Sequence, residues 1–254
     1  MVKMTNLTGK VVFVTGASRG IGAVTTRNLL EAGASVVAHF GRTGQGAESL
    51  LDDFGLDRVH PVQGDLAHVG EATRLFQEAV AWKGRVDVLV NNAGISPALA
   101  IDVPLDEWAT VWTQTLQVNL ISVAESCRAA LLHYGEHGGG IIINIASRAA
   151  FRGDNPDAMH YAASKGAVIT LTKSIARGFA AQGVLAYSVA PGWVSTEMAE
   201  AYLADHAEEL RRELPMGQAA PPEDVANTVV FLASGIVPHM TGATLDINGA
   251  SYVR

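Results

Sequence analysis

The stretch KVVFVTGASRGIG, residues 10–22, joins an apolar run to a glycine-rich loop and to the start of a helical pattern. The run at residues 10–16 ends in glycine, which is typical of a strand buried on both faces. Gly16, Gly20 and Gly22 allow the backbone to turn sharply and to approach a pyrophosphate, and the N-terminus of the next helix attracts phosphate. Between a buried strand and an amphipathic helix, this spacing predicts a dinucleotide-binding turn, although a plain tight turn also explains the glycines.

The alternation of apolar runs and helical patterns continues along the rest of the chain. Apolar residues at helical spacing occupy the segments between the runs, for example at residues 21–33 and 71–84. Such alternation predicts a parallel sheet with helices on both faces, and the absence of a repeat or linker favours one α/β domain over residues 1–254. Besides the first, the apolar runs that read as strands lie at residues 35–40, 59–63, 86–92, 140–147 and 184–191, with a weaker one at 243–249.

Composition argues against several classes of protein. The 254 residues carry a net charge of −7 with no block of Lys or Arg, so nucleic acid is not the expected partner. No segment approaches the roughly 18 apolar residues of a membrane span, and no apolar segment of signal-peptide length begins the chain. Cys127 is the only cysteine, so a disulfide within the chain is impossible and a reducing, cytoplasmic location is expected. The histidines are scattered, and no metal site is predicted.

A charge-rich segment with a helical pattern interrupts the alternation at about residues 195–214. It follows the sixth predicted strand and precedes a helix expected to begin near Pro222. Open α/β sheets bind ligands at the carboxyl ends of their strands, so an insertion there predicts a small lid over a substrate pocket. A solvated pair of surface helices explains the same pattern.

The end of the second predicted strand bears on the choice of cofactor. An acid at this place would bind the 2′-hydroxyl of NAD, but the sequence reads AHFGRTG and has none. Phe40 occupies about that position, Arg42 follows it, and Arg19 comes from the glycine loop. Two guanidinium groups suit a 2′-phosphate, so NADP(H) is favoured and NAD(H) is possible. Alternatively, Arg42 is a solvated loop residue and either cofactor is accepted.

The stretch YAASK, residues 161–165, places a phenol and an ammonium four residues apart. In a helix, Tyr161 and Lys165 lie on the same face, one turn apart. A nearby cation favours the phenolate, so we expect Lys165 to lower the pKa of Tyr161 from its ordinary value of about 10 and to fit it for general acid–base chemistry.

Five motifs together resemble the short-chain dehydrogenase/reductase family, in the family's order and over essentially the whole chain. They are TGASRGIG (15–22), NNAG (91–94), Ser147 at the end of IIINIAS, YAASK (161–165) and PGWVST (191–196). The resemblance implies a Rossmann-like, doubly wound sheet of seven strands. It also implies hydride transfer between the nicotinamide C4 of NAD(P) and the carbon of a ketone or secondary alcohol.

The resemblance assigns roles to four candidate catalytic residues. Tyr161 would be the acid–base, Ser147 would hold the substrate oxygen, and Lys165 would tune Tyr161 and grip the nicotinamide ribose. Asn119, in LQVNLIS, would help to position a proton-relay water. A hydroxyl donor and an acidic phenol would stabilise the negative charge that develops on a ketone oxygen during reduction.

Cofactor contacts are expected from the carboxyl ends of the predicted strands, although Asn, Gly and Pro also end strands for conformational reasons alone. By resemblance, Asp65 would bond the adenine amino group. The full set of expected cofactor contacts is Gly16, Ser18, Arg19, Gly20, Ile21, Gly22, Phe40, Arg42, Asp65, Leu66, Asn92, Ala93, Gly94, Tyr161, Lys165, Pro191, Gly192, Val194 and Thr196.

The substrate is less well specified by the sequence. Arg148 and Arg152 either meet a carboxylate or sugar hydroxyls, or face solvent or a neighbouring subunit. The aromatic residues either wall the pocket or serve ordinary packing. The expected pocket residues are Ser96, Arg148, Phe151, Arg152, Trp193, Met198 and Tyr202.

Three functions are compatible with these motifs. The resemblance favours reduction of a 3-oxoacyl thioester or similar small ketone, with a sugar or polyol dehydrogenase as the alternative. A non-catalytic NADP-sensing regulator on the same fold is a third function, of another class. The stretch LLHYGEHGGG (131–140) lacks the Lys or Arg that would favour docking of an acidic carrier protein. By resemblance, a homotetramer, or else a homodimer, would form through helices at about 106–134 and 159–182.

Overall fold

The computed structural model describes residues 5–197, 206, 208 and 212–254. Its seven strands form one parallel sheet in the order β3-β2-β1-β4-β5-β6-β7. This arrangement confirms the predicted doubly wound, Rossmann-like sheet. The strands are β1 (Val11–Val14), β2 (Ser35–Phe40), β3 (Val59–Gln63), β4 (Val88–Asn91), β5 (Gly140–Ile145), β6 (Val184–Pro191) and β7 (Thr244–Ile247).

Several strands are shorter than the apolar runs that predict them. β1 stops at Val14, and β5 stops at Ile145, before Ser147. Residues just beyond these ends still bond to the neighbouring strand, since Thr15 N–H donates to Val90 and Ala146 N–H donates to Val189. The chain then turns away from the sheet, so the polar ends of the runs lie in loops along one edge.

Helices alternate with the strands along the chain, as predicted. The helix expected near Pro222 begins at that residue. The long helices expected at 106–134 and 159–182 are present, and the first contains a π-helical turn. The helices are α1 (Gly20–Glu31), α2 (Gln45–Phe54), α3 (Glu71–Lys83), α4 (Leu105–Leu116), the π-helical turn η1 (Gln117–Ile121), α5 (Ser122–His137), α6 (Ala149–Arg152), η2 (Pro156–Ala158), α7 (Met159–Phe179), η3 (Ala180–Gln182), α10 (Pro222–Ser234) and η4 (Pro238–Met240).

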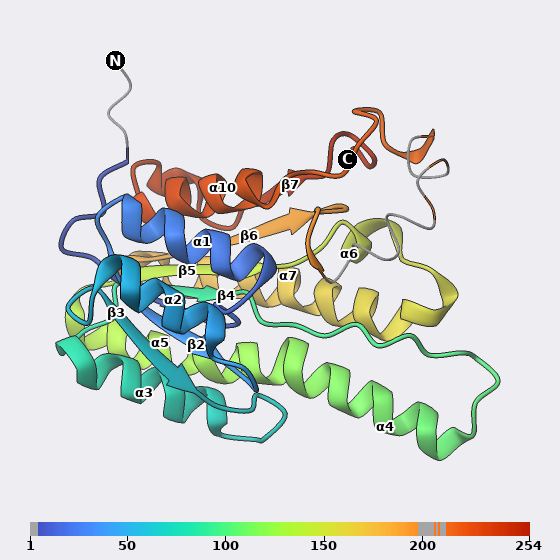
Figure 1. The fold of residues 1–254 in the computed structure, drawn as a ribbon, viewed down its shortest axis with the longest axis horizontal. Coiled ribbons are helices and arrows are strands. Elements are labelled where there is room, and N and C mark those ends of the chain that lie inside the picture. Colours follow the sequence, from blue (N-terminus) through green and yellow to red (C-terminus); the bar gives the residue numbers. More distant parts are fainter. Residues whose placement is uncertain (1–4, 198–205, 207, 209–211) are drawn as a thin grey trace.

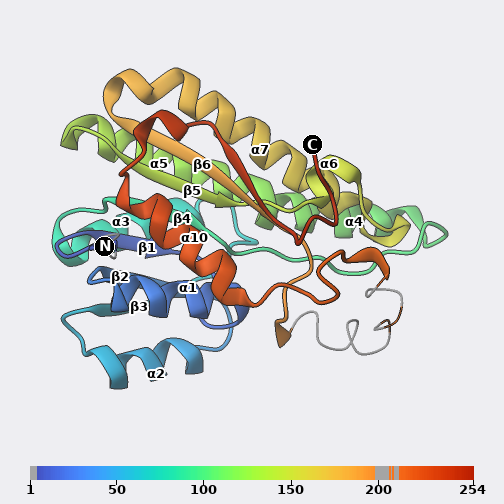
Figure 2. The ribbon, with the colours of Figure 1, turned by 90° about the horizontal axis from the view of Figure 1, so that it is seen from above.

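Two hydrophobic cores lie on opposite faces of the sheet. Alternate residues of β1 pack into the two cores, with Val12 and Val14 on one face and Val11 and Phe13 on the other. Helices α1, α2 and α10 cover the first face, whereas α3, α5 and α7 cover the second. Figure 1 shows α1 and α10 above the sheet and α3, α4 and α5 below it, and Figure 2 shows the same layers from above. Because both faces are covered, the strands read as continuous apolar runs.

None of the described helices combines the length and apolar character needed to cross a bilayer. The expected lid at about residues 195–214 lies largely outside the described residues. Two expected pocket residues, Met198 and Tyr202, also lie outside them, so the lid stays a prediction.

Candidate active site

The loops that carry the predicted site meet at the carboxyl edge of the sheet. A Cβ placed on Gly20 would lie 3.5 Å from the Thr196 side chain, so the glycine loop touches the loop after β6. A Cβ on Gly94 would lie 3.4 Å from both Asn119 Oδ1 and Lys165 Nζ. Segments that follow β1, β4 and β6 therefore come together with α7, as the sequence predicts.

The glycine loop is folded tightly on itself. Gly16 has a φ of +67°, which favours glycine. A Cβ on Gly22 would overlap the carbonyl oxygen of Gly16, so α1 can pack here only without a side chain. Asn92 Nδ2 donates to the carbonyls of Thr15 and Gly16, at 3.0 Å each. A tight, glycine-rich loop in front of a helix N-terminus fits the pyrophosphate of a dinucleotide.

Tyr161 and Lys165 share one face of α7, as the YAASK spacing predicts. Lys165 Nζ lies 5.7 Å from the centre of the Tyr161 ring. The Ser147 side chain interacts with the Tyr161 hydroxyl and favours its phenolate form. Tyr161 and Ser147 are half-buried, whereas Lys165 is only 4% exposed. A substrate oxygen can therefore approach the two hydroxyls, with the ammonium behind them.

The expectation that the pKa of Tyr161 lies below its ordinary value is wrong in this structure. Desolvation of the phenol raises the pKa of Tyr161 above its ordinary value; the interaction with Ser147 opposes this, and the charge of Asp154 adds to it. The sequence spacing places the cation but says nothing of how far the phenol is desolvated. The structure therefore presents Tyr161 as a protonated donor near neutral pH.

Lys165 is a buried cation whose charge has few polar partners. Its Nζ donates to the carbonyl of Ile145 at 2.8 Å, and no ion pair with a carboxylate is found among the described residues. Burial lowers the pKa of Lys165 to about 8. The ammonium is still the main form at neutral pH, and it keeps donors for another acceptor such as a ribose hydroxyl.

Asn119 lies in the π-helical turn η1, where the wider turn sets it apart from the regular helix. Its Oδ1 accepts from Ile95 N–H at 2.8 Å, and its Nδ2 donates to the Ile95 carbonyl at 2.8 Å and to Ser164 at 3.1 Å. Ser164 in turn donates to the Tyr161 carbonyl at 2.7 Å. Asn119 thus ties the loop after β4 to the helix of Tyr161, and its role with a water stays a prediction.

The expected cofactor residues lie along this same edge, with different degrees of exposure. Arg19 and Arg42 are exposed, and Phe40 packs against Gly44, whose added Cβ would come within 2.9 Å of the ring. Asp65 is exposed and accepts from Ala67 N–H at 3.0 Å. Gly192 lies near Arg148. The remaining expected contacts are half-buried at Ser18, Ile21 and Ala93, and buried at Leu66, Pro191 and Val194.

The two candidate arginines of the substrate pocket share one carboxylate partner, although Arg148 is buried and Arg152 is exposed. Arg148 is buried, and its Nη2 lies 2.8 Å from Glu213 Oε1. Arg152 Nη1 lies 3.1 Å from the same oxygen. Arg148 also bonds to Ser251 and stands over the Trp193 ring, at 5.9 Å. The alternative that both arginines face solvent or another subunit is therefore wrong for Arg148, which is buried and paired with a carboxylate of the same chain. Arg152 is exposed and lies near the same carboxylate.

Of the other expected pocket residues, Ser96 is exposed and Phe151 is packed against the C-terminal segment. Ser96 is exposed on the loop after β4. Phe151 stacks on Tyr252, with ring centres 6.1 Å apart, and the Arg254 guanidinium lies 4.1 Å from the Phe151 ring centre. Phe151 thus packs on the C-terminal segment, which corresponds to the ordinary-packing alternative.

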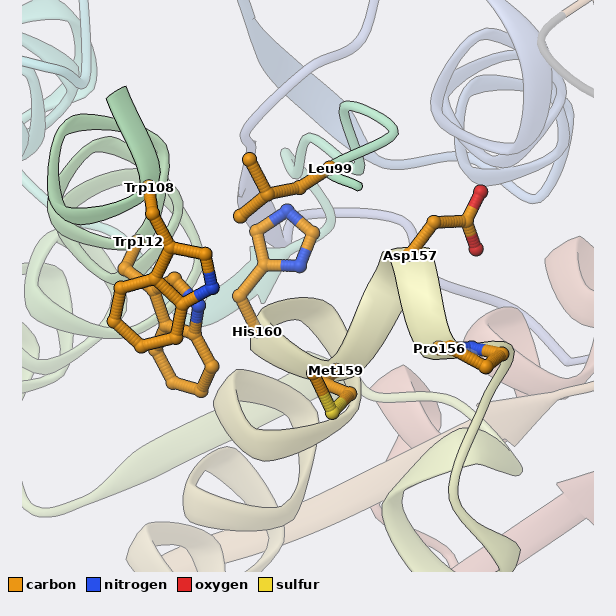
Figure 3. Close-up of a pocket in the computed structure, with 7 residues that line it drawn as sticks. All are labelled: Leu99, Trp108, Trp112, Pro156, Asp157, Met159 and His160. Carbon is orange, nitrogen blue, oxygen red and sulfur yellow. The ribbon is translucent and has the colours of Figure 1, made fainter. Parts of the chain in front are cut away.

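A gap lined in part by His160 lies between α4 and α7 (Figure 3). Figure 3 shows the His160 ring directed toward Leu99 and the overlapping rings of Trp108 and Trp112. The Trp112 and His160 ring centres are 6.1 Å apart. The gap has no room for a water molecule. We interpret it as imperfect packing between two helices and not as a substrate site.

Comparison with known proteins agrees with this geometry. A family model described as enoyl-(acyl carrier protein) reductase matches residues 16–250. The 3-oxoacyl-[acyl-carrier-protein] reductase FabG of Staphylococcus aureus (strain Mu50) is 34% identical over 248 residues, which cover 96% of this chain and 98% of that protein. The chain belongs to the short-chain dehydrogenase/reductase family.

Solved structures of family members superpose closely on this chain. A 3-oxoacyl-(acyl-carrier-protein) reductase from Agrobacterium tumefaciens C58, with NADP bound, has a TM-score of 0.88 at 31% identity and covers 97% of this chain and 95% of its own. A protein assigned as an NAD(P)-dependent gluconate 5-dehydrogenase, from Beutenbergia cavernae, has a TM-score of 0.88 at 36% identity and covers 98% of both chains. The two similar structures thus differ in substrate class.

Sequence reasoning missed residues that support the site of this family member from behind. Ser164 holds Asn119, Glu213 pairs with Arg148, and His39 bonds to the glycine loop. His39 had a signal in the sequence, since it is the one residue of the apolar run SVVAHF whose ring nitrogens can donate or accept a hydrogen bond. Glu213 had none, because its partners are more than 60 residues away in the sequence.

Proposed function

We propose that the protein is an NADP(H)-dependent oxidoreductase that interconverts a ketone and a secondary alcohol, with Tyr161 as the acid–base. The observation that carries the proposal is the half-buried Tyr161, whose hydroxyl interacts with Ser147 and which lies beside the buried ammonium of Lys165. The glycine loop that shares this edge fits a dinucleotide, because Gly16, Gly20 and Gly22 allow a close approach to its backbone.

When bound, NADPH supplies the hydride that reduces the carbonyl carbon. Tyr161 gives its phenolic proton to the carbonyl oxygen, which completes the hydroxyl group of the alcohol. Ser147 donates a hydrogen bond to the same oxygen and stabilises the charge that develops there. Lys165 stabilises the phenolate that Tyr161 leaves behind, until a proton from solvent restores the phenol. Oxidation of an alcohol runs the same steps in reverse.

The preference for NADP(H) is supported by Arg19 and Arg42, which are exposed on the expected adenosine side. The second strand ends in Phe40 without an acid that would bind the 2′-hydroxyl of NAD. Replacing both arginines with alanine should weaken NADPH binding by about tenfold or more and leave NADH binding nearly unchanged. Equal weakening of both cofactors would contradict the assignment of these arginines to a 2′-phosphate.

Two substrate classes are supported by similar proteins. The 3-oxoacyl thioester class is the activity named for the Staphylococcus and Agrobacterium relatives, and we favour it or a similar small ketone. A sugar acid or polyol is the alternative, supported by the Beutenbergia structure at 36% identity. NADPH oxidation, followed by the loss of its near-ultraviolet absorbance, should be measured with short 3-oxoacyl thioesters, simple ketones and keto-sugar acids. Tight NADPH binding without turnover on any of them would indicate a cofactor-sensing regulator instead.

We further propose a homotetramer, or else a homodimer, built on the surfaces of α4, α5 and α7. Small exposed residues on α7, including Ala163, Ser174 and Gly178, permit close approach of another helix. Light scattering coupled to size-exclusion chromatography tests this, and a monomer at all concentrations would contradict it. A cytoplasmic location is proposed from the single, buried and unpaired Cys127, and cell fractionation tests it.

A further inference from the structure

His39 is a buried histidine with two defined hydrogen bonds. It lies in β2 and is 2% exposed. Its Nδ1 faces the backbone N–H of Gly16 at 3.2 Å, and its Nε2 faces the carbonyl of Gly64 at 3.1 Å. A backbone N–H can only donate and a carbonyl can only accept, so Nδ1 must accept and Nε2 must carry the proton. The two partners therefore fix His39 as the neutral Nε2–H tautomer.

The two partners of His39 belong to two different segments of the expected cofactor site. Gly16 is the first glycine of the glycine loop, and Gly64 directly precedes Asp65 at the end of β3. Backbone bonds of β2 reinforce the same link, because Ala17 N–H donates to the His39 carbonyl at 2.7 Å. Asn92 holds the glycine loop from its other side. The His39 ring thus spans the distance between the pyrophosphate loop and the adenine side.

We propose that His39 is a positioning residue that sets the spacing between the glycine loop and the Gly64–Asp65 turn, and that protonation of His39 weakens binding of the dinucleotide. This inference rests on the proposed use of NADP(H). A proton on His39 Nδ1 would turn this atom from an acceptor into a donor. The Gly16 N–H would then face another N–H group, and the hydrogen bond between them would be lost. The loop would lose this attachment, and the backbone that should meet the pyrophosphate would lose its fixed position.

The surroundings of His39 favour the neutral ring. Burial is the largest influence and lowers the pKa of His39 below its ordinary value. The charged groups that act on it are Glu71 and Arg74 on α3 and Asp65 after β3. The two carboxylates oppose the effect of burial and the guanidinium adds to it, while Glu71 and Arg74 are themselves an ion pair at 2.7 Å. On the glycine-loop side, the contacts are backbone groups of Gly16 and Ala17.

The sign of the pH effect follows from this lowered pKa. A protein that binds the dinucleotide only with neutral His39 loses affinity by up to about tenfold for each pH unit below the pKa of His39 in the free protein. The contribution of His39 to folding has the same sign. It is present above the pKa of an unfolded-chain histidine and is lost as the pH falls through the lower pKa of the folded protein.

The first test needs no cofactor. Nitrogen-15 NMR of the histidine rings distinguishes the Nε2–H and Nδ1–H tautomers and follows their titration. We expect His39 to be the Nε2–H tautomer near pH 7 and to titrate below the ordinary histidine pKa. An Nδ1–H tautomer, or a His39 that is already charged near pH 7, would overturn the inference.

The second test measures binding of NADPH by fluorescence titration to the whole protein at about pH 7.5 and about pH 5.5. The variant His39→Gln keeps a polar side chain but cannot bond to both partners, whereas His60→Gln is the matched control on the neighbouring strand, where His60 stacks on Trp82. We expect His39→Gln to bind about tenfold more weakly at the higher pH and to lose most of the pH dependence. His60→Gln should behave like the wild type at both values.

The outcomes separate this inference from the proposed function. If His39→Gln binds NADPH like the wild type, with the same pH dependence, the positioning role is wrong but the function stands. If the wild type binds no nicotinamide cofactor at either pH, the function and this inference both fail. If His39→Gln does not fold, the tautomer of wild-type His39 decides the matter.

Discussion

The ammonium nitrogen of Lys165 lies 5.7 Å from the centre of the Tyr161 ring and donates to the Ile145 carbonyl at 2.8 Å. The cation is therefore held by the backbone of β5, and no acid among the described residues forms an ion pair that would cancel its charge. Its position relative to Tyr161 is fixed by α7 and by the strand beneath it. A phenolate formed at Tyr161 would find a fixed positive charge already in place.

The raised pKa of Tyr161 predicts different pH profiles for the two directions of reaction. Reduction needs the protonated phenol, which persists through neutral pH, so kcat/KM for reduction should change little from about pH 6 to about pH 8 as far as Tyr161 is concerned. Oxidation needs the phenolate and should become faster as the pH rises above neutrality. Initial rates in both directions across this range check the prediction.

Asp154 supplies the control for this pH prediction. Its charge raises the pKa of Tyr161, so Asp154→Asn should lower that pKa and shift the oxidation profile toward lower pH. An oxidation rate that is flat with pH in the wild type, and unmoved in Asp154→Asn, would contradict the assignment of Tyr161 as the titrating base.

The buried charge of Lys165 should destabilise the folded protein, although turnover requires it. Lys165→Met removes a buried charge, so it should raise the free energy of unfolding by about 1–4 kcal/mol near pH 7 while abolishing turnover. The pKa of Lys165 is about 8 in the folded protein and higher in an unfolded chain, so the wild type gains stability as the pH rises above about 8. The advantage of the variant should shrink over the same range.

Urea denaturation of Lys165→Met at neutral and alkaline pH checks this prediction. Lys173→Met, on an exposed position of the same helix, is the matched control and should change stability by less than about 0.5 kcal/mol. A loss of stability in Lys165→Met near pH 7 would show that Lys165 stabilises the fold and would contradict the account.

The glycine loop predicts a contrast between two Gly→Ala substitutions. In Gly22→Ala the new Cβ would overlap the Gly16 carbonyl oxygen, so we expect a loss of about 1–3 kcal/mol and much weaker NADPH binding. In Gly135→Ala the new Cβ meets nothing within 4 Å on helix α5, so stability should rise by about 0.5–1 kcal/mol. Thermal unfolding with and without NADPH checks both, and equal effects of the two would argue against a constrained loop.

The ion pair between Arg148 and Glu213 should couple the two residues energetically. Arg148 is buried, so removing Glu213 alone leaves its charge without a carboxylate at 2.8 Å. A double-mutant cycle with Arg148→Met and Glu213→Gln should give a coupling of about 0.5–3 kcal/mol. The exposed pair of Arg27 and Asp53 is the comparison and should give less than about 0.5 kcal/mol. If the coupling energy of Arg148 and Glu213 is no larger than that of Arg27 and Asp53, the structural role of the buried pair is contradicted.

Much of the fold follows from the sequence because burial on both faces leaves a simple pattern. Val11 to Val14 are all buried, so β1 is an unbroken apolar run that any hydrophobic scan detects. The pairing of Tyr161 with Lys165 could also be predicted from the sequence, since helical spacing alone places them on one face. Local patterns of this kind specify the elements and the residues at their ends.

The rest depends on contacts between distant segments. The bond from Gly16 to His39 and the pairing of Arg148 with Glu213 join parts of the chain that no local pattern relates. The pKa of Tyr161 was predicted in the wrong direction because spacing locates Lys165 but does not measure desolvation of the phenol. Electrostatics at this site is a property of the packed structure and not of the motif.

The most direct test of the central claim is the turnover of Tyr161→Phe, measured together with its affinity for NADPH. Phenylalanine removes only the hydroxyl and leaves the ring, so the fold and the glycine loop should be unaffected. We expect turnover to fall by about a hundredfold or more with an NADPH affinity close to that of the wild type. Turnover near the wild-type rate in Tyr161→Phe would contradict the assignment of Tyr161 as the proton donor and, with it, the account of this site.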